Sequence, residues 1–200
     1  MKKLILNFIF LATTTLTTGQ TIVNEAFSKS YLYESDKDYS QAISVIFTVY
    51  DVNSYTMNLR LGWLNYLAGE YIKSQGFYKK AIALESKSIE ARLGYVYPTS
   101  AMENWDDVIK TYNEILSIDP YNSTVNYRMA SIYSYRKEYV KAAAYAEKVV
   151  TLYPFDYDSN YLLGHIYISL GKIKEAKICL IRALHYNPSS IEAKTLLDKI

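Results

Sequence analysis

The chain has 200 residues, which suffice for one ordinary domain or an array of small repeats. Half of the residues are hydrophobic and 21% are charged, which excludes a disordered chain. The formal net charge is +2, and without Lys2 and Lys3, which lie in a segment expected to be removed, 20 basic residues balance 20 acidic ones. We therefore expect no nucleic-acid partner. The single cysteine, Cys179, excludes an internal disulfide and a multi-thiolate metal site.

Residues 1–19 have the pattern of a signal peptide. Lys2 and Lys3 precede an apolar run over residues 4–12, and a small, polar stretch rich in threonine follows, with the cleavage site expected near Gly19 and Gln20. The apolar run is about half of the roughly 20 residues that a membrane-spanning helix needs. The pattern thus predicts export of residues 20–200 to the periplasm or the cell exterior, soluble after cleavage.

The rest of the chain repeats with a period of 34 residues. Pro120, Pro154 and Pro188 are 34 residues apart, and Gly69 and Gly171 are separated by three such intervals. Two further columns follow the same interval. They are Tyr71, Trp105, Tyr139 and Ile173, which are bulky and mostly aromatic, and Ser74, Val108, Ala142 and Ala176, which are small. Each unit reads as two amphipathic helices joined by a tight turn.

These units resemble the tetratricopeptide repeat. The motif is carried most fully by Leu163, Gly164, Tyr167, Gly171, Ala176, Ala183 and Pro188. The resemblance implies an all-α fold, a right-handed α-solenoid of about five 34-residue helix-turn-helix repeats with a C-terminal capping helix. Within a repeat domain over 20–200, it places a degenerate repeat at 23–54, full repeats at 55–88, 89–122, 123–156 and 157–188, and the capping helix at 189–200. It implies an interaction scaffold and names no ligand.

Two local patterns depart from a regular repeat. Pro98 falls within the expected first helix of repeat 89–122, so we expect that helix to kink or end early. Ser100 and Glu103 have the spacing of a capping box and predict a new helix start there. Ser189 and Glu192 have the same spacing and predict the start of the terminal helix.

The residue inventory argues against an enzyme. The two histidines, His165 and His185, lack a partner that the sequence can nominate, and metal-ligand and phosphate-loop spacings are absent. Asp106 and Asp107 open an expected helix, where the helix dipole favours negative charge. Cys179 has the pattern of a small buried core residue. We therefore expect no catalytic residues, no cofactor and no metal site.

In tetratricopeptide repeats the first helices line a concave groove, so the resemblance implies a set of groove residues here. The set is Trp63, Tyr66, Tyr97, Tyr127, Arg128, Tyr135, Tyr161 and His165. Tyrosine suits such a groove because it offers rigid apolar area and a hydroxyl group. The alternative interpretation is that several of these tyrosines pack between neighbouring helices. The subclass of the family that clamps a C-terminal carboxylate is disfavoured, because Leu59, Trp63 and Gly94 stand where it needs Lys and Asn, and only Arg128 matches.

The leading hypothesis is an exported, non-enzymatic scaffold that binds a protein or peptide in this aromatic groove. Two alternatives stay open, a carbohydrate-binding module and a self-associating structural protein, a homo-oligomer of the outer envelope. Peripheral association with envelope complexes, and an origin as a fragment or paralogue of a larger outer-membrane protein, are also open.

Overall fold

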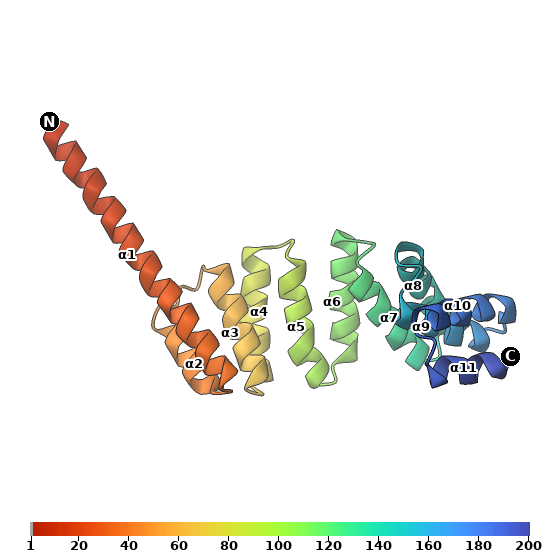
Figure 1. Ribbon diagram of the computed structural model, residues 1–200. Coiled ribbons are helices and arrows are strands. Elements are labelled where there is room, and N and C mark those ends of the chain that lie inside the picture. Colours follow the sequence, from red (N-terminus) through yellow and green to blue (C-terminus); the bar gives the residue numbers. More distant parts are fainter. Residues whose placement is uncertain (1) are drawn as a thin grey trace. The chain divides into compact units, whose positions relative to one another are not determined.

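The computed structural model describes the backbone of residues 2–200 and the side chains from Gly19 onward. Over these residues the chain forms eleven helices and no strand (Figure 1). The predicted all-α solenoid of helix-turn-helix repeats is confirmed. The helices are α1 (Lys2–Ser35), α2 (Tyr39–Phe47), α3 (Tyr55–Leu67), α4 (Tyr71–Leu84), α5 (Ile89–Ala101), α6 (Trp105–Ile118), α7 (Ser123–Tyr135), α8 (Tyr139–Leu152), α9 (Tyr157–Ser169), α10 (Ile173–Tyr186) and α11 (Ile191–Asp198). The predicted signal peptide lies, except for Gly19, outside the residues whose side chains are described, and it stays a prediction.

The helix boundaries repeat every 34 residues from α3 onward. The first helices α3, α5, α7 and α9 each have 13 residues, and the second helices α4, α6, α8 and α10 each have 14. Helix α11 begins at Ile191, in register with the first helices. The N-terminal second helix α2 is shorter, with nine residues.

Side-chain caps fix where each first helix begins. The cap residues are Ser54, Ser88, Asn122, Asp156 and Ser190, each accepting a hydrogen bond from the backbone N–H three residues on. Such a bond satisfies an N–H group that has no partner within the helix and stabilises the helix by about 1 kcal/mol. The cap of α11 is therefore Ser190, and the prediction that assigned this role to Ser189 is wrong.

Pro98 neither ends α5 nor shortens it. The helix continues three residues beyond the proline to Ala101, and the Pro98 carbonyl accepts the N–H of Met102 at 3.1 Å. Ser100 lies within this helix, and α6 begins only at Trp105, with Asn104 Oδ1 accepting the Asp107 N–H at 3.3 Å. The early end and the new helix start at Ser100 were wrong, because packing outweighs one lost backbone hydrogen bond, and the kink at Pro98 stays a prediction.

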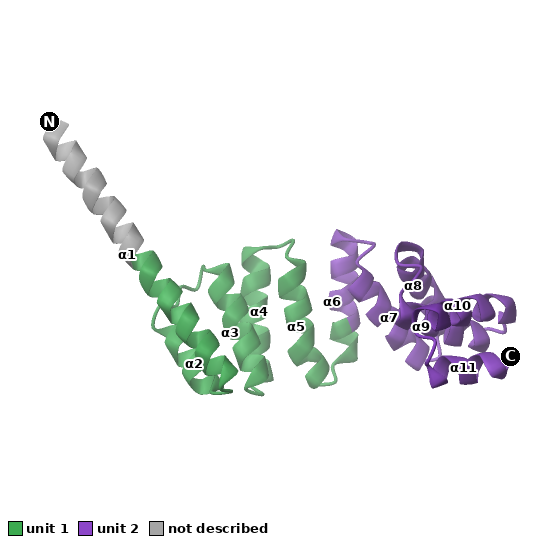
Figure 2. Ribbon diagram, viewed as in Figure 1, with its two compact units in different colours: residues 1–108 green, residues 109–200 purple. Residues whose placement is uncertain are grey.

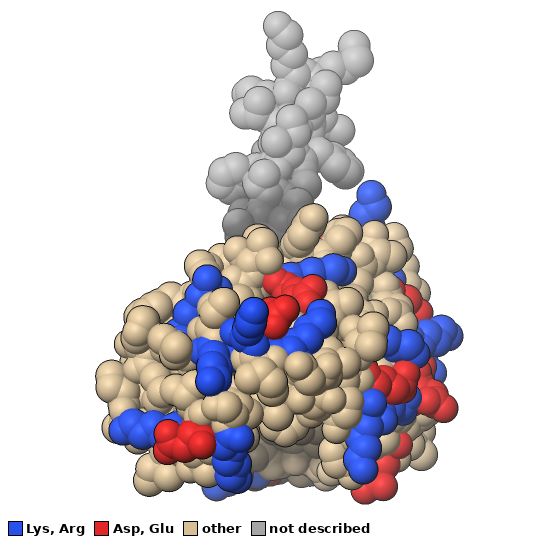
Figure 3. All heavy atoms as spheres, turned by 90° about the vertical axis from the view of Figure 1, so that its right-hand side faces the viewer, with Lys and Arg blue, Asp and Glu red and all other residues tan. Residues whose placement is uncertain are grey.

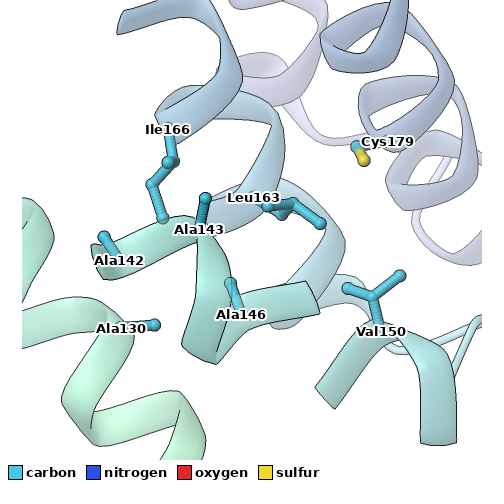
Figure 4. Close-up of a cluster of buried hydrophobic side chains, with 8 residues drawn as sticks. All are labelled: Ala130, Ala142, Ala143, Ala146, Val150, Leu163, Ile166 and Cys179. Atoms are coloured by element: carbon cyan, nitrogen blue, oxygen red, sulfur yellow. The ribbon is translucent and has the colours of Figure 1, made fainter. Parts of the chain in front are cut away.

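The chain divides into two compact units (Figure 2). Unit 1 covers residues 1–108 and holds α1–α5 and the first residues of α6, and unit 2 covers residues 109–200. A core cluster in unit 1 contains Ala42, Ile46, Met57, Leu61 and Leu64. The core of unit 2, shown in Figure 4, contains Ala130, Ala142, Ala143, Ala146, Val150, Leu163, Ile166 and Cys179. Its four alanines let the backbones of α7, α8 and α9 approach closely.

Candidate binding groove

A groove of about 890 Å³ opens on unit 1 along helices α1, α3 and α5. Helices α3 and α5 are the first helices of two successive repeats, and α1 takes the same place in the N-terminal repeat. Most of the lining is apolar or aromatic. Its apolar and aromatic side chains include Phe27, Tyr31, Leu59, Trp63, Leu93 and Tyr97.

An ion pair between buried Arg60 and half-buried Glu34 holds α1 against α3 on one side of the groove. The Arg60 guanidinium pairs with the Glu34 carboxylate, and its Nε and Nη2 atoms donate to Ser30 Oγ at 3.1 and 3.0 Å. It also lies 3.9 Å from the centroid of the Tyr31 ring. The Trp63 indole N–H donates to the second oxygen of Glu34 at 2.7 Å. Both carboxylate oxygens are therefore engaged, which removes most of the penalty of burying the Arg60 charge.

Trp63 of α3 and Tyr97 of α5 form an aromatic wall of the groove, and the Tyr66 ring, outside the lining, packs against both. The ring centroids of Trp63 and Tyr97 are 5.8 Å apart, those of Tyr66 and Tyr97 5.4 Å, and those of Trp63 and Tyr66 5.6 Å. Such pairs contribute about 0.5–1.5 kcal/mol beyond the area that they bury. Tyr97 nevertheless keeps half of its surface exposed. This wall is thus partly structural and partly available to a ligand.

The Tyr78 side chain of α4 lines the groove between α3 and α5. A Cβ atom added to Gly62 would lie 3.0 Å from its ring, and one added to Gly94 would lie 2.2 Å from Tyr78 Cε1. Only glycine therefore leaves room for this ring on both helices. Burial raises the pKa of the Tyr78 hydroxyl well above its usual range, so the group stays neutral.

One end of the groove, at the start of α5, carries an acidic side chain. Glu90 lies in the first turn of α5 and accepts a hydrogen bond from the Tyr55 hydroxyl through Oε2 at 3.0 Å. The Ser88 hydroxyl lies 2.8 Å from the same Tyr55 oxygen. Burial raises the pKa of Tyr55, the Ser88 hydrogen bond opposes this rise and Glu90 reinforces it. Tyr55 is therefore a hydroxyl donor to Glu90 at neutral pH.

Unit 2 carries a smaller pocket of about 370 Å³ beside α7 and the start of α9. Its lining includes Tyr127, Arg128, Tyr153, Asp156 and Asp158. Burial raises the pKa of Tyr127, and the nearby Asp158 carboxylate adds to this effect. The pocket thus combines aromatic surface with charges of both signs.

The structure groups five of the eight predicted groove residues. Trp63 and Tyr97 line the groove of unit 1 with Tyr66 packed against both rings, and Tyr127 and Arg128 line the pocket of unit 2.

The other three lie on first helices of unit 2. Tyr135, 91% exposed, ends α7, His165 is exposed on α9, and the Tyr161 ring stacks on Tyr157 with centroids 5.9 Å apart. Participation of all eight residues in binding stays a prediction.

The α1 side of the unit 1 groove was not predicted. Phe27, Tyr31 and Glu34 lie in the degenerate N-terminal repeat, where the 34-residue columns do not apply. The one sign in the sequence of a polar partner on this side was Arg60, a basic residue on a mostly apolar helix face. Its partner could not be identified because Glu34 belongs to that degenerate segment.

The described residues offer little other chemistry. No group of His, Cys, Asp and Glu among them could hold a metal ion, and no helix among them is long and apolar enough to cross a membrane. Burial raises the pKa of the Cys179 thiol to about 11, which keeps it protonated. On the face drawn in Figure 3, basic and acidic side chains are interspersed.

Comparison with known proteins finds a family match in the C-terminal third of the chain and solved structures of similar fold. A family model of the tetratricopeptide repeat matches residues 135–200. A solved MamA protein is similar with a TM-score of 0.70 and 19% identity, covering 84% of this chain and 92% of that chain. MamA from residue 41 to the end, from Desulfovibrio magneticus RS-1, has a TM-score of 0.69 and 13% identity, with coverages of 85% and 97%.

A tetratricopeptide repeat protein from Parabacteroides merdae ATCC 43184 is also similar. Its TM-score is 0.74 at 14% identity, covering 90% of this chain and 72% of that chain. At these identities the likeness shows the fold alone. A search of curated proteins finds no match.

Proposed function

We propose that this chain, a tetratricopeptide-repeat protein as its 34-residue pattern predicts, is a non-enzymatic scaffold that binds a protein or peptide segment in the groove of unit 1. The observation that carries this proposal is the groove itself. It runs along the first helices of successive repeats and exposes aromatic surface from Trp63 and Tyr97. Large rigid aromatic side chains in a concave site are typical anchors for a protein ligand.

Replacing Tyr97 with alanine tests the proposal. Short random peptides displayed on phage would be selected on the full chain, and the dissociation constant of a selected peptide measured by fluorescence anisotropy. Tyr97→Ala should weaken binding about tenfold, because truncating a central aromatic anchor commonly costs more than 1 kcal/mol. Trp63 lines the same groove, so its fluorescence should change when the peptide binds.

Tyr121→Ala is the matched control. Tyr121 is 64% exposed and precedes α7, outside the lining of the groove, so its removal should leave the affinity unchanged. Equal losses in the two variants, or no selected peptide, would refute the proposal. Glycan-array binding without peptide binding would favour the carbohydrate-binding alternative, and a concentration-dependent mass in light scattering would favour self-association.

We also propose that residues 1–19 direct export, on the basis of the two lysines and the short apolar run that follows them. When residues 1–200 are expressed in a bacterial host, the protein recovered from the envelope fraction should have the intact mass of residues 20–200. Replacing Leu6 and Ile9 with lysine should block this processing, because charges interrupt the apolar run. An unprocessed wild-type chain in the cytoplasm would contradict export and leave the binding proposal unaffected.

A further inference from the structure

Of the charged side chains that line the unit 1 groove, some are paired with an opposite charge within the lining and one is not. Arg60 is the only cation among the lining residues, and its charge is neutralised by Glu34. Glu90 is exposed and accepts the Tyr55 hydroxyl through one oxygen. A carboxylate has about four acceptor sites on its two oxygens, so Glu90 retains the capacity to bind a donor. The lining therefore has one negative charge that no cation of the lining balances.

This charge lies next to apolar surface on the same helix face. Glu90, Leu93 and Tyr97 are spaced at i, i+3 and i+7 along α5, and all three line the groove. Thr56, Leu59 and Trp63 repeat this spacing along α3. With a rise of about 1.5 Å per residue, Leu93 lies about 4.5 Å and Tyr97 about 10 Å from Glu90 along the helix axis. A ligand could contact acid and apolar wall with neighbouring residues.

We propose that this groove binds an apolar segment of a partner protein that carries a lysine or arginine, with the cation at Glu90 and the apolar side chains against Leu93 and Trp63. The inference rests on the proposed peptide-binding function and specifies its ligand. Charge complementarity is the argument for this occupant, because an acidic segment would meet an uncompensated carboxylate.

The size of the preference follows from the exposure of Glu90. Ion pairs at the rim of an interface are weak and screened by salt. A selected peptide with lysine should therefore bind about threefold to tenfold more tightly than the same peptide with glutamine, and the difference should shrink at high salt.

The test compares the peptides that phage display selects on four full-length proteins. On wild type, selected peptides should be enriched in lysine or arginine beside apolar residues. On Glu90→Gln, which keeps an acceptor for Tyr55, this enrichment should disappear. On Glu90→Lys, acidic residues should replace the basic ones.

Glu103→Lys is the matched control for the change in net charge. Glu103 is exposed, lies outside the groove lining and has the left-handed backbone that Lys137 adopts at the equivalent position, with φ of 57° and 61°. It should select the same peptides as wild type. Should Glu90→Lys lose its helical circular dichroism, Glu90→Gln still decides the matter.

The outcomes separate the inference from the function on which it rests. Basic enrichment that depends on Glu90 supports the inference. Peptides selected without basic enrichment, or with an enrichment that all variants share, overturn it and leave peptide binding intact. Absence of any selected peptide on wild type overturns both.

Discussion

A left-handed residue recurs in the turn between the two helices of each repeat. Gly69 and Gly171 have φ of 77° and 72°, and the non-glycine residues Glu103 and Lys137 have φ of 57° and 61° at the same place in the 34-residue register. Glycine adopts this conformation readily, whereas a side chain raises its free energy by about 1–2 kcal/mol. Two turns of the four full repeats therefore carry backbone strain that the other two avoid, and Lys37, with φ of 60°, carries it in the turn of the N-terminal repeat.

Replacing Glu103 or Lys137 with glycine should stabilise the protein. Each change relieves the strain of the left-handed conformation in the folded state. Glycine also raises the entropy of the unfolded chain, which offsets part of this gain, so the free energy of unfolding should rise by about 0.5–1 kcal/mol. Urea unfolding followed by circular dichroism measures this change.

The reciprocal control is Gly69→Ala. A Cβ at Gly69 would meet nothing within 4 Å, so any loss would come from the backbone alone. We expect a loss of about 1 kcal/mol. If the two glycine variants are neutral or destabilising while Gly69→Ala is silent, the strain argument fails.

At the scale of helices, the 34-residue period predicted the two-helix unit because equivalent positions of successive repeats pack in the same way. Glycine and alanine columns mark close approaches, and the structure shows one at Gly164, where an added Cβ would lie 2.9 Å from Leu180 Cγ. The spacing of single capping residues was less informative. Ser100 and Ser189 both had the right spacing, yet tertiary packing placed the helix starts elsewhere.

A column of buried asparagines was missed, although its period was visible. Asn58, Asn126 and Asn160 are fully buried near the start of their helices. Each Nδ2 atom donates to two backbone carbonyls, four and six residues earlier, and so ties the preceding loop to the helix. These asparagines were missed because only apolar residues were expected in the core.

The N-terminal repeat shows why the groove could be predicted only in part. Helix α2 ends at Phe47, and Tyr50 beyond it packs on the core of unit 1 and donates its hydroxyl to Asn58 Oδ1 at 2.9 Å. The path of this loop is set by such side-chain contacts and departs from the 34-residue register. Contacts of α1 with α3, such as the pair of Glu34 and Arg60, likewise involve a segment outside the repeat register and leave no periodic signal.

At the scale of the whole molecule, packing is local within each unit. In unit 1, α3 packs on α4 and α4 on α5, and in unit 2, α7 packs on α8, α8 on α9 and α9 on α10. The stability of such an array is close to a sum of terms from each repeat and its neighbours. Damage to one packing site should therefore spread over adjacent helices and then fade.

Gly94→Ala should show this local response. The added Cβ would lie 2.2 Å from Tyr78 Cε1, and the ring has little room to move because α3 also approaches it closely at Gly62, where a Cβ would lie 3.0 Å from the ring. Overpacking of this kind costs about 1–3 kcal/mol. Hydrogen exchange should accelerate in α3, α4 and α5, while α9 and α10 keep wild-type protection, because no contact of theirs has changed.

Gly76→Ala is the control for a glycine-to-alanine change in the same unit. A Cβ at Gly76 would meet nothing within 4 Å, and the residue is exposed within α4, so helix propensity predicts a gain of about 0.5–1 kcal/mol. The two substitutions should therefore change protection in α4 in opposite directions. A uniform loss over all helices in Gly94→Ala would mean that the chain unfolds as a single cooperative body, and the additive picture of the repeats would have to be abandoned.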